Sequence, residues 1–326
     1  MIIENSKTYN VNDVENLFFR PTFCGNAAED LGIRVIYNMP LPTKVPVFTH
    51  NNDILKPFSS GWQGGASSTM VQKEIPMQKV KAESSYSAED YFSTIYELVT
   101  NSADVSLGDL TGTELEKAET ELFRRSIADS IYGSTWFGDT SGNISSRENF
   151  SGFFHHIIEG VESGKENYHV ELCNEDVEMP IMLILRNAWN MASDELRALA
   201  SEGQLVFFVS SDIYDAYHFY LEENGMNLYT DNNTSRPTLK YHGITLVEVP
   251  TKRYNAALAY SFCILTDRRN FVLALNTADA PEKEIRMWYN PDEMENRQRV
   301  VFLAGTTIVD ANLVSGYIYN MDLTLL

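Results

Sequence analysis

Residues 204–225, with the sequence QLVFFVSSDIYDAYHFYLEENG, determine the fold class of this 326-residue chain. Residues 204–210 contain a continuous apolar run, which is typical of a buried strand. Residues 212–223 predict a helix that ends at Gly225, because glycine commonly terminates helices. A strand followed directly by a helix predicts a layer in which helices cover a sheet.

Upstream of this layer, two helices are predicted from their start signals. Ser87 with Asp90, and Thr113 with Glu116, have the spacing of a capping box, in which side chains satisfy the first free amides of a helix. Apolar residues follow each box at intervals of three to four, which indicates a helix with one face in the core. Shorter helices are predicted over residues 150–158 and 193–201. Between these two, residues 181–185 form a strand-length apolar run.

The region downstream is rich in predicted strands. An alternating pattern surrounds Gly243, and the turn at residues 267–270 separates two apolar runs. The predicted strands are residues 239–249, 261–266, 271–275, 284–289 and 299–306, of which the last two form a long pair. Together with the helices they predict a mixed α+β fold.

The N-terminal part of the chain has a different character. Residues 1–45 contain several prolines and predict an irregular extended arm with one short strand at residues 33–37. Residues 47–80 predict a long two-stranded ribbon with a tip, residues 59–69, rich in glycine, serine and threonine. An isolated hairpin is marginal in water, so the ribbon is expected to lie on another surface, either that of a neighbour or its own domain. The predicted assembly interface consists of Phe58, Trp62, Gly64 and Gly65.

The chain is strongly acidic, with 45 Asp and Glu residues against 25 Lys and Arg residues and a formal net charge of −20. Affinity for nucleic acid comes mainly from basic side chains that displace counterions, so the charge argues against DNA as a bound ligand. An acidic inner wall would suit a container for DNA, which it would repel. Acidity that simply aids solubility is the alternative.

The sequence predicts neither a membrane segment nor a signal peptide. The apolar runs are strand-sized, and the first residues lack an apolar leader, so we expect a cytoplasmic origin. The three cysteines, Cys24, Cys173 and Cys263, are far apart and predict neither a disulfide framework nor a zinc site.

No catalytic, cofactor-binding or metal-binding residues are predicted. The acidic run at residues 171–178 could supply paired carboxylates but lacks the spacing of a calcium loop, and a solvated loop explains it better. His155 and His156 are adjacent, whereas helical metal ligands are three or four residues apart. His218 lies among tyrosines on a predicted helix. Nucleotide-binding and serine-hydrolase motifs are absent, so we expect that the protein is not an enzyme.

The order of elements, which is arm, ribbon, helix, α/β layer and closing strand pair, resembles the Hong Kong 97 type major capsid protein of tailed phages. The chain looks most like the capsid proteins of gut Bacteroidetes phages. The segments that carry the resemblance are 204–225 (QLVFFVSSDIYDAYHFYLEENG), 239–250 (LKYHGITLVEVP), 262–275 (FCILTDRRNFVLAL) and 285–313 (IRMWYNPDEMENRQRVVFLAGTTIVDANL).

The resemblance implies a domain order. Residues 1–42 would be the N-terminal arm, 43–80 the extended β-ribbon loop, and 81–141 the peripheral domain with its spine helix. Residues 142–281 would be the axial domain, and 282–326 would return to the peripheral domain.

The resemblance also implies a function and partners. Hexamers and pentamers of the chain would form an icosahedral phage head in the virion, made in the host cytoplasm, which encloses double-stranded DNA without sequence-specific binding. Portal and decoration proteins are further expected partners. Some relatives carry a long N-terminal scaffolding segment, for which this chain has no room, so a separate scaffold protein or prior cleavage is implied. Covalent crosslinking through Lys56, Lys73 or Lys79 is not predicted.

Three alternatives stay open. An encapsulin nanocompartment shell shares the fold but holds a cargo protein. An α/β hydrolytic enzyme would use the acidic loop near Glu175. A tail or portal component is the third.

Overall fold

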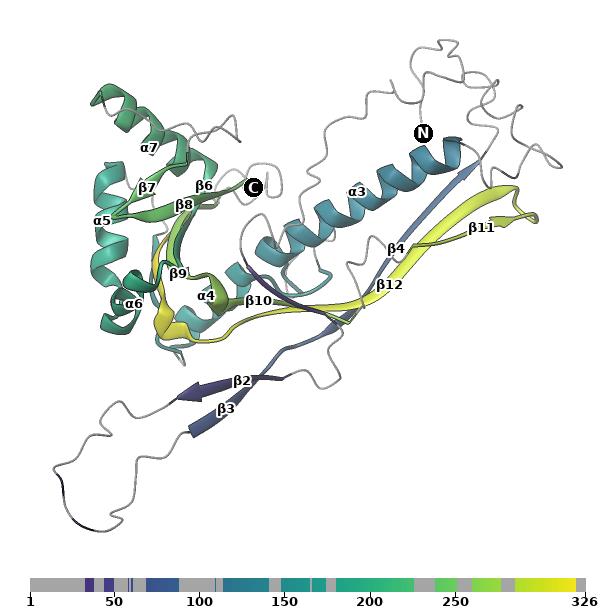
Figure 1. Ribbon diagram of the computed structural model, residues 1–326. Coiled ribbons are helices and arrows are strands. Elements are labelled where there is room, and N and C mark those ends of the chain that lie inside the picture. The colour runs from purple at the N-terminus through teal and green to yellow at the C-terminus, as the bar shows by residue number, and fades with distance from the viewer. Residues whose placement is uncertain are drawn as a thin grey trace.

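The protein was analysed as a computed structural model. It describes residues 33–37, 44–49, 58, 60, 69–87, 109, 114–140, 148–164, 166–173, 180–225, 238–250, 260–276 and 285–320. Figure 1 shows an elongated molecule with a helix-covered sheet at one end, a long helix lying along strands at the other, and a two-stranded ribbon that projects from the body.

The elongated end is built on a five-stranded sheet. Its path is β1 (Arg34–Tyr37), β10 (Phe271–Leu275), β12 (Glu295–Ile308) and β11 (Arg286–Asn290), and β4 (Gln78–Ser87) pairs with β12 as well. β12 is 14 residues long, so it pairs with β10 near its end and with β4 and β11 along the rest. The sequence predicted the pairing of β11 with β12, and the structure confirms it.

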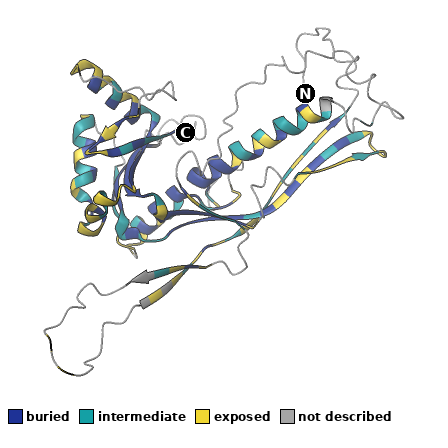
Figure 2. Cartoon of the chain, viewed as in Figure 1, coloured by how far each residue is buried: buried dark blue, intermediate teal, exposed yellow. Residues whose placement is uncertain are grey.

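Helix α3 (Glu114–Phe137) covers one face of this sheet. Phe123, Ile127 and Ile131 recur at helical spacing and pack against alternate residues of β12, Val300 and Phe302. Burial along β12 alternates between buried and more accessible residues from Glu295 to Phe302, because α3 covers one face and leaves the other in solvent (Figure 2).

The other end is a six-stranded sheet. Its order is β5 (His169–Cys173), β13 (Val314–Asn320), β9 (Tyr260–Asp267), β6 (Leu205–Ser210), β8 (Ile244–Val249) and β7 (Lys240–Tyr241). Helices α5 (Ile181–Met191) and α7 (Ser211–Glu223) cover one face, and α4 (Phe153–Ser163) covers the other. The short α6 (Asp194–Ala198) and the 3-10 turns η3 (Leu199–Glu202), η4 (Arg268–Asn270) and η6 (Ala311–Leu313) complete the described helices.

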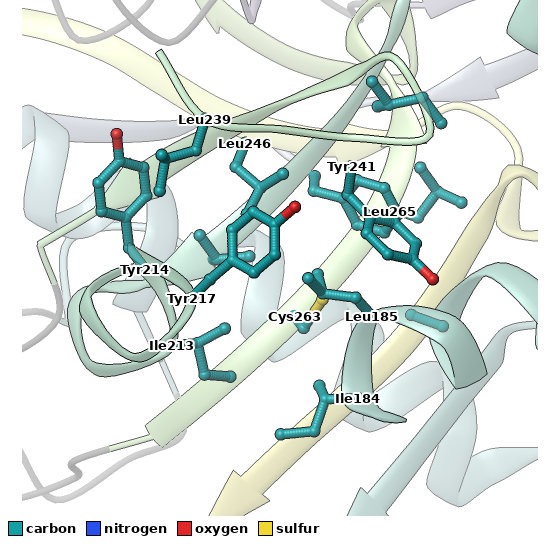
Figure 3. Packing of buried hydrophobic residues seen from close by; sticks show 14 of the residues in the cluster. Ile184, Leu185, Ile213, Tyr214, Tyr217, Leu239, Tyr241, Leu246, Cys263 and Leu265 are labelled. Carbon is teal, nitrogen blue, oxygen red and sulfur yellow. The ribbon is translucent and has the colours of Figure 1, made fainter. Parts of the chain in front are cut away.

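β6 lies at the centre, and all six of its residues are buried. Phe207 and Val209 point toward α5 and α7, where Figure 3 shows Ile213, Tyr217 and Leu265 in the same core. Neighbouring residues of β6 point to the opposite face, as the two-residue period of a strand requires. Burial on both faces explains why this strand is a continuous apolar run rather than an alternating one.

The two ends are joined by an aromatic core at the end of α3. Trp136 is fully buried, and its ring centroid lies 5.1 Å from that of Phe208 on β6 and 5.4 Å from that of Phe153 on α4. Trp136 also lies 5.9 Å from Phe271, the first residue of β10. Because these rings come from elements of both sheets, the described body is one packed unit.

Three predictions need correction. Residues 181–185 begin helix α5, since a short apolar run does not distinguish a strand from a buried helix. β9 and β10 flank the predicted turn but belong to different sheets. Ser87 is the last residue of strand β4, and the helix that it is predicted to cap lies outside the described residues. Residues 136–142 (WFGDTSG) predict a turn from their sequence, but Trp136 and Phe137 are the last residues of helix α3. The predicted helix at residues 212–223 is confirmed.

Candidate assembly surfaces

The ribbon consists of β2 (Lys44–Thr49) and β3 (Thr69–Glu74), which pair antiparallel from Lys44 opposite Glu74 to Thr49 opposite Thr69. It forms a separate two-stranded sheet that extends away from the rest of the chain in Figure 1. A two-stranded ribbon has too little apolar surface for independent stability, so this element is suited to contact another molecule.

The predicted interface residues lie in the segment that joins the two strands. Phe58 is 98% exposed, and Met70 on β3 is also exposed. Trp62, Gly64 and Gly65 lie outside the described residues. An aromatic side chain that is almost fully exposed contributes nothing to its own core and is a strong candidate for a contact with a neighbour.

The base of the ribbon is anchored in the body. Val45 and Ile75 are each 2% exposed and pack with Val272 and Ala274 of β10. Alternate residues of the ribbon base, such as Pro46 and Gln72, are exposed. The sequence predicted a two-stranded ribbon over residues 47–80; in the structure the paired strands end at Glu74, and residues 75–77 separate β3 from β4.

A second exposed apolar surface lies at the opposite end of the molecule, on the β11–β12 hairpin (Figure 1). Met287, Trp288 and Met294 are exposed there, and the guanidinium carbon of Arg299 lies 5.6 Å from the Trp288 ring centroid. Sequence analysis missed this surface, although the signal was present: MW in the middle of a charged hairpin places two large apolar side chains on opposite faces of an edge strand.

A third exposed apolar position, apart from the ribbon and the hairpin, is Phe219 on α7, which is 61% exposed while Ile213, Tyr217 and Leu221 of the same helix are buried. The amphipathic pattern therefore positions Phe219 on the outer face, at the end of the molecule that carries the six-stranded sheet. The ribbon, the hairpin and α7 thus supply three separated contact surfaces.

The residues considered for chemistry are accounted for by ordinary contacts. His155 lies 3.2 Å from Asp139 and 3.6 Å from Glu159, and His156 Nε2 lies 3.0 Å from the carbonyl oxygen of Thr306. His218 pairs with Glu222 on the surface of α7. Residues 174–178 of the acidic run lie outside the described residues.

Within the described ranges, no group of three or more His, Cys, Asp or Glu residues could hold a metal ion. The described residues line an open cavity of about 340 Å³ beside α4 and another of about 490 Å³ between α3 and β4. No described helix is long and apolar enough to cross a membrane.

Similar structures cover nearly the whole chain. The capsid of Ralstonia phage GP4 superposes with a TM-score of 0.58 at 12% sequence identity, covering 98% of this chain and 97% of that one. The satellite phage P4 procapsid including the size determination (Sid) protein gives a TM-score of 0.55 at 11% identity, covering 98% and 92%. This chain has the Hong Kong 97 type capsid fold.

The holo-SrpI encapsulin complex from Synechococcus elongatus PCC 7942 is also similar. It superposes with a TM-score of 0.52 at 8% identity, covering 98% of this chain and 97% of that one. No protein-family model and no curated protein sequence matches the chain.

Proposed function

We propose that this chain is the major capsid protein of a tailed phage, which assembles into the hexamers and pentamers of an icosahedral head in the virion. The observation that carries the proposal is the β2–β3 ribbon, which is paired with itself, projects from the body and leaves Phe58 in solvent. A lone subunit has no use for such an element, whereas a shell of many copies does.

The proposed contacts follow from the three surfaces. The ribbon, within the extended loop at residues 43–80, lies across a neighbouring subunit. The β11–β12 hairpin, within the peripheral regions at residues 81–141 and 282–326, meets other subunits at the far end. The α7 end, within the axial domain at residues 142–281, points toward the local symmetry axis. Residues 1–42 serve as the N-terminal arm. Shell strength comes from many contacts of modest size.

The enclosed molecule is proposed to be double-stranded DNA, held without sequence-specific binding. The net charge of −20 supports this, since a wall that repels phosphate keeps packed duplex mobile. Separate scaffold, portal and decoration proteins are proposed partners, and the likeness to gut Bacteroidetes phages stays a prediction. The function requires no catalysis.

The proposal is tested by producing the full chain in a bacterial host and examining purified particles by negative-stain microscopy. We expect closed shells or capsomers from the full chain. A deletion variant that lacks residues 59–68 is expected not to form closed shells. Normal shells from that deletion variant would contradict the role of the ribbon.

The second candidate is an encapsulin-like nanocompartment, which the similarity to the SrpI complex favours. The two are separated by content. Particles isolated from the natural source that contain nuclease-protected DNA support the capsid, whereas particles that contain a co-purifying cargo protein support the nanocompartment. A monomer with enzymatic turnover would favour the hydrolytic alternative.

A further inference from the structure

The ribbon changes direction at a short break in the chain. β3 ends at Glu74 and β4 begins at Gln78, and the residues between them are in neither strand. Pro76 has no amide hydrogen to donate to a strand ladder, which suits it to this position. Gly305 of β12 lies directly against it, since a Cβ at Gly305 would be 2.3 Å from the Pro76 carbonyl oxygen. Residues 75–77 therefore form a pivot seated on β12.

One ion pair connects the ribbon to the body across this pivot. Lys73 Nζ on β3 lies 3.0 Å from Glu166 Oε1, in the segment between α4 and β5. The two residues are 93 positions apart, and the Lys73 side chain is 29% exposed. Lys73 is the second-to-last residue of β3, directly before the pivot. A contact that fixes its side chain therefore also restrains the direction of the ribbon.

Glu166 is itself held in place. Partial burial raises the pKa of Glu166, but Lys73, with a smaller effect of Tyr168, holds it below its ordinary value; the backbone amide of Tyr168 also donates a hydrogen bond to the Glu166 carbonyl oxygen at 3.1 Å. The Tyr168 ring lies on α4 at Gly160, where an added Cβ would come 2.2 Å from the ring. Gly160 thus permits the close approach that positions Tyr168, and Tyr168 positions the acceptor for Lys73.

The space around the ion pair is open. A cavity of about 340 Å³ separates the ribbon base from α4, and its walls include Lys73, Pro76, His156, Glu159 and Tyr168. A ribbon base packed tightly against α4 would have one direction fixed by sterics. Because a cavity lies there, the apolar contacts of Val45 and Ile75 with β10 hold the base of the ribbon on the body. The Lys73–Glu166 ion pair is then the contact that sets the angle of the ribbon relative to α4.

We propose that the Lys73–Glu166 ion pair is a latch that fixes the direction of the β2–β3 ribbon relative to α4 before the ribbon meets a neighbour. The latch restrains a two-stranded lever about the pivot at residues 75–77. If the proposed shell function holds, the latch pre-orders the ribbon for the neighbouring subunit and lowers the entropy lost on assembly.

The test measures the ribbon direction in the unassembled full chain. Spin labels are introduced as non-canonical residues at Met70 on β3 and at Glu195 on α6, both exposed, and the distance distribution between them is recorded by pulsed electron resonance. We expect one dominant narrow distribution, with about a tenth of the molecules or fewer at other distances. Lys73→Gln and Glu166→Gln should each raise that minor population to roughly a fifth to a third, because loss of a partly exposed ion pair shifts an equilibrium about two- to fivefold.

The charge-swapped variant, Lys73→Glu with Glu166→Lys, is expected to restore the narrow distribution. Lys79→Gln is the matched control, since Lys79 is exposed on β4 beyond the pivot and should leave the distribution unchanged. The latch is overturned if the single variants keep the narrow distribution, or if the swap is as broad as they are. The distance measurement uses the unassembled chain and requires no shell. It therefore tests the latch even if the capsid proposal fails.

Discussion

Gly305→Ala is the most informative single substitution for the fold. The added Cβ would lie 2.3 Å from the Pro76 carbonyl oxygen, 3.1 Å from the Pro76 carbonyl carbon and 3.2 Å from Met77 Cα, all of them backbone atoms. The first contact must widen to at least 3.0 Å, and no side-chain rotation can supply that space. The backbone at Pro76 must therefore move away from β12.

The cost follows from what the pivot holds. Ile75 precedes Pro76, is 2% exposed and packs against β10, so movement of residues 75–77 separates Ile75 from β10. Overpacking of this kind costs about 1–3 kcal/mol, and partial loss of the Ile75 contact acts in the same direction. We expect the free energy of unfolding to fall by about 2–3 kcal/mol.

The assay is urea-induced unfolding of the unassembled chain followed by tryptophan fluorescence, since Trp136 is fully buried in the core. Val301→Ala, at an exposed position of the same strand, is the control and should change the free energy of unfolding by less than about 0.5 kcal/mol. Unchanged stability in Gly305→Ala would show that the pivot does not rest on β12.

Three further predictions concern other parts of the molecule. Phe58→Ser should leave the free energy of unfolding within about 0.5 kcal/mol of wild type, because the side chain is 98% exposed. The yield of particles should fall. Reduced stability with full particle yield would refute the interface role of Phe58. Gln298→Met should raise the free energy of unfolding, measured by denaturant titration, by about 1–2 kcal/mol. The reason is that both polar atoms of this buried amide lack a hydrogen-bond partner among the described residues. The control Gln72→Met, on the exposed face of the ribbon, should not raise it. Burial lowers the pKa of His156 below its ordinary 6.5, so the contribution of the neutral ring to stability is present above pH 6.5 and is lost as the pH falls below it. Between pH 7.5 and 5.5, His156→Gln should therefore lose less stability than wild type. An equal loss would contradict the assignment of this pH dependence to His156.

The α/β layer was predictable from sequence because its signals are local. The run LVFFVS is buried on both faces of a central strand, and the helix after it ends where a glycine follows. Long helix α3 was signalled by its apolar spacing. In each case neighbouring residues in the chain carry the information.

The errors arose where distant partners decide the structure. β9 and β10 have hairpin-like spacing, but β9 pairs with β6 and β13 while β10 pairs with β1 and β12. The alternation from Val71 to Lys79 continues through the pivot, and the break there depends on Gly305. The Lys73–Glu166 contact spans 93 positions and has no local signal.

The ribbon was predictable from a glycine-rich segment flanked by alternating residues. Phe58, Trp62, Gly64 and Gly65 stay predictions as interface residues. The hairpin surface at Met287 and Trp288 was missed, although two large apolar residues inside a charged hairpin were its signal.

The central claim is that the ribbon of one copy lies on another copy, and an electron cryo-microscopy reconstruction of purified particles tests it most directly. The account predicts a closed icosahedral shell in which β2 and β3 of each subunit cross a neighbouring subunit. A particle-free, monomeric protein whose ribbon is folded onto its own five-stranded sheet would contradict it.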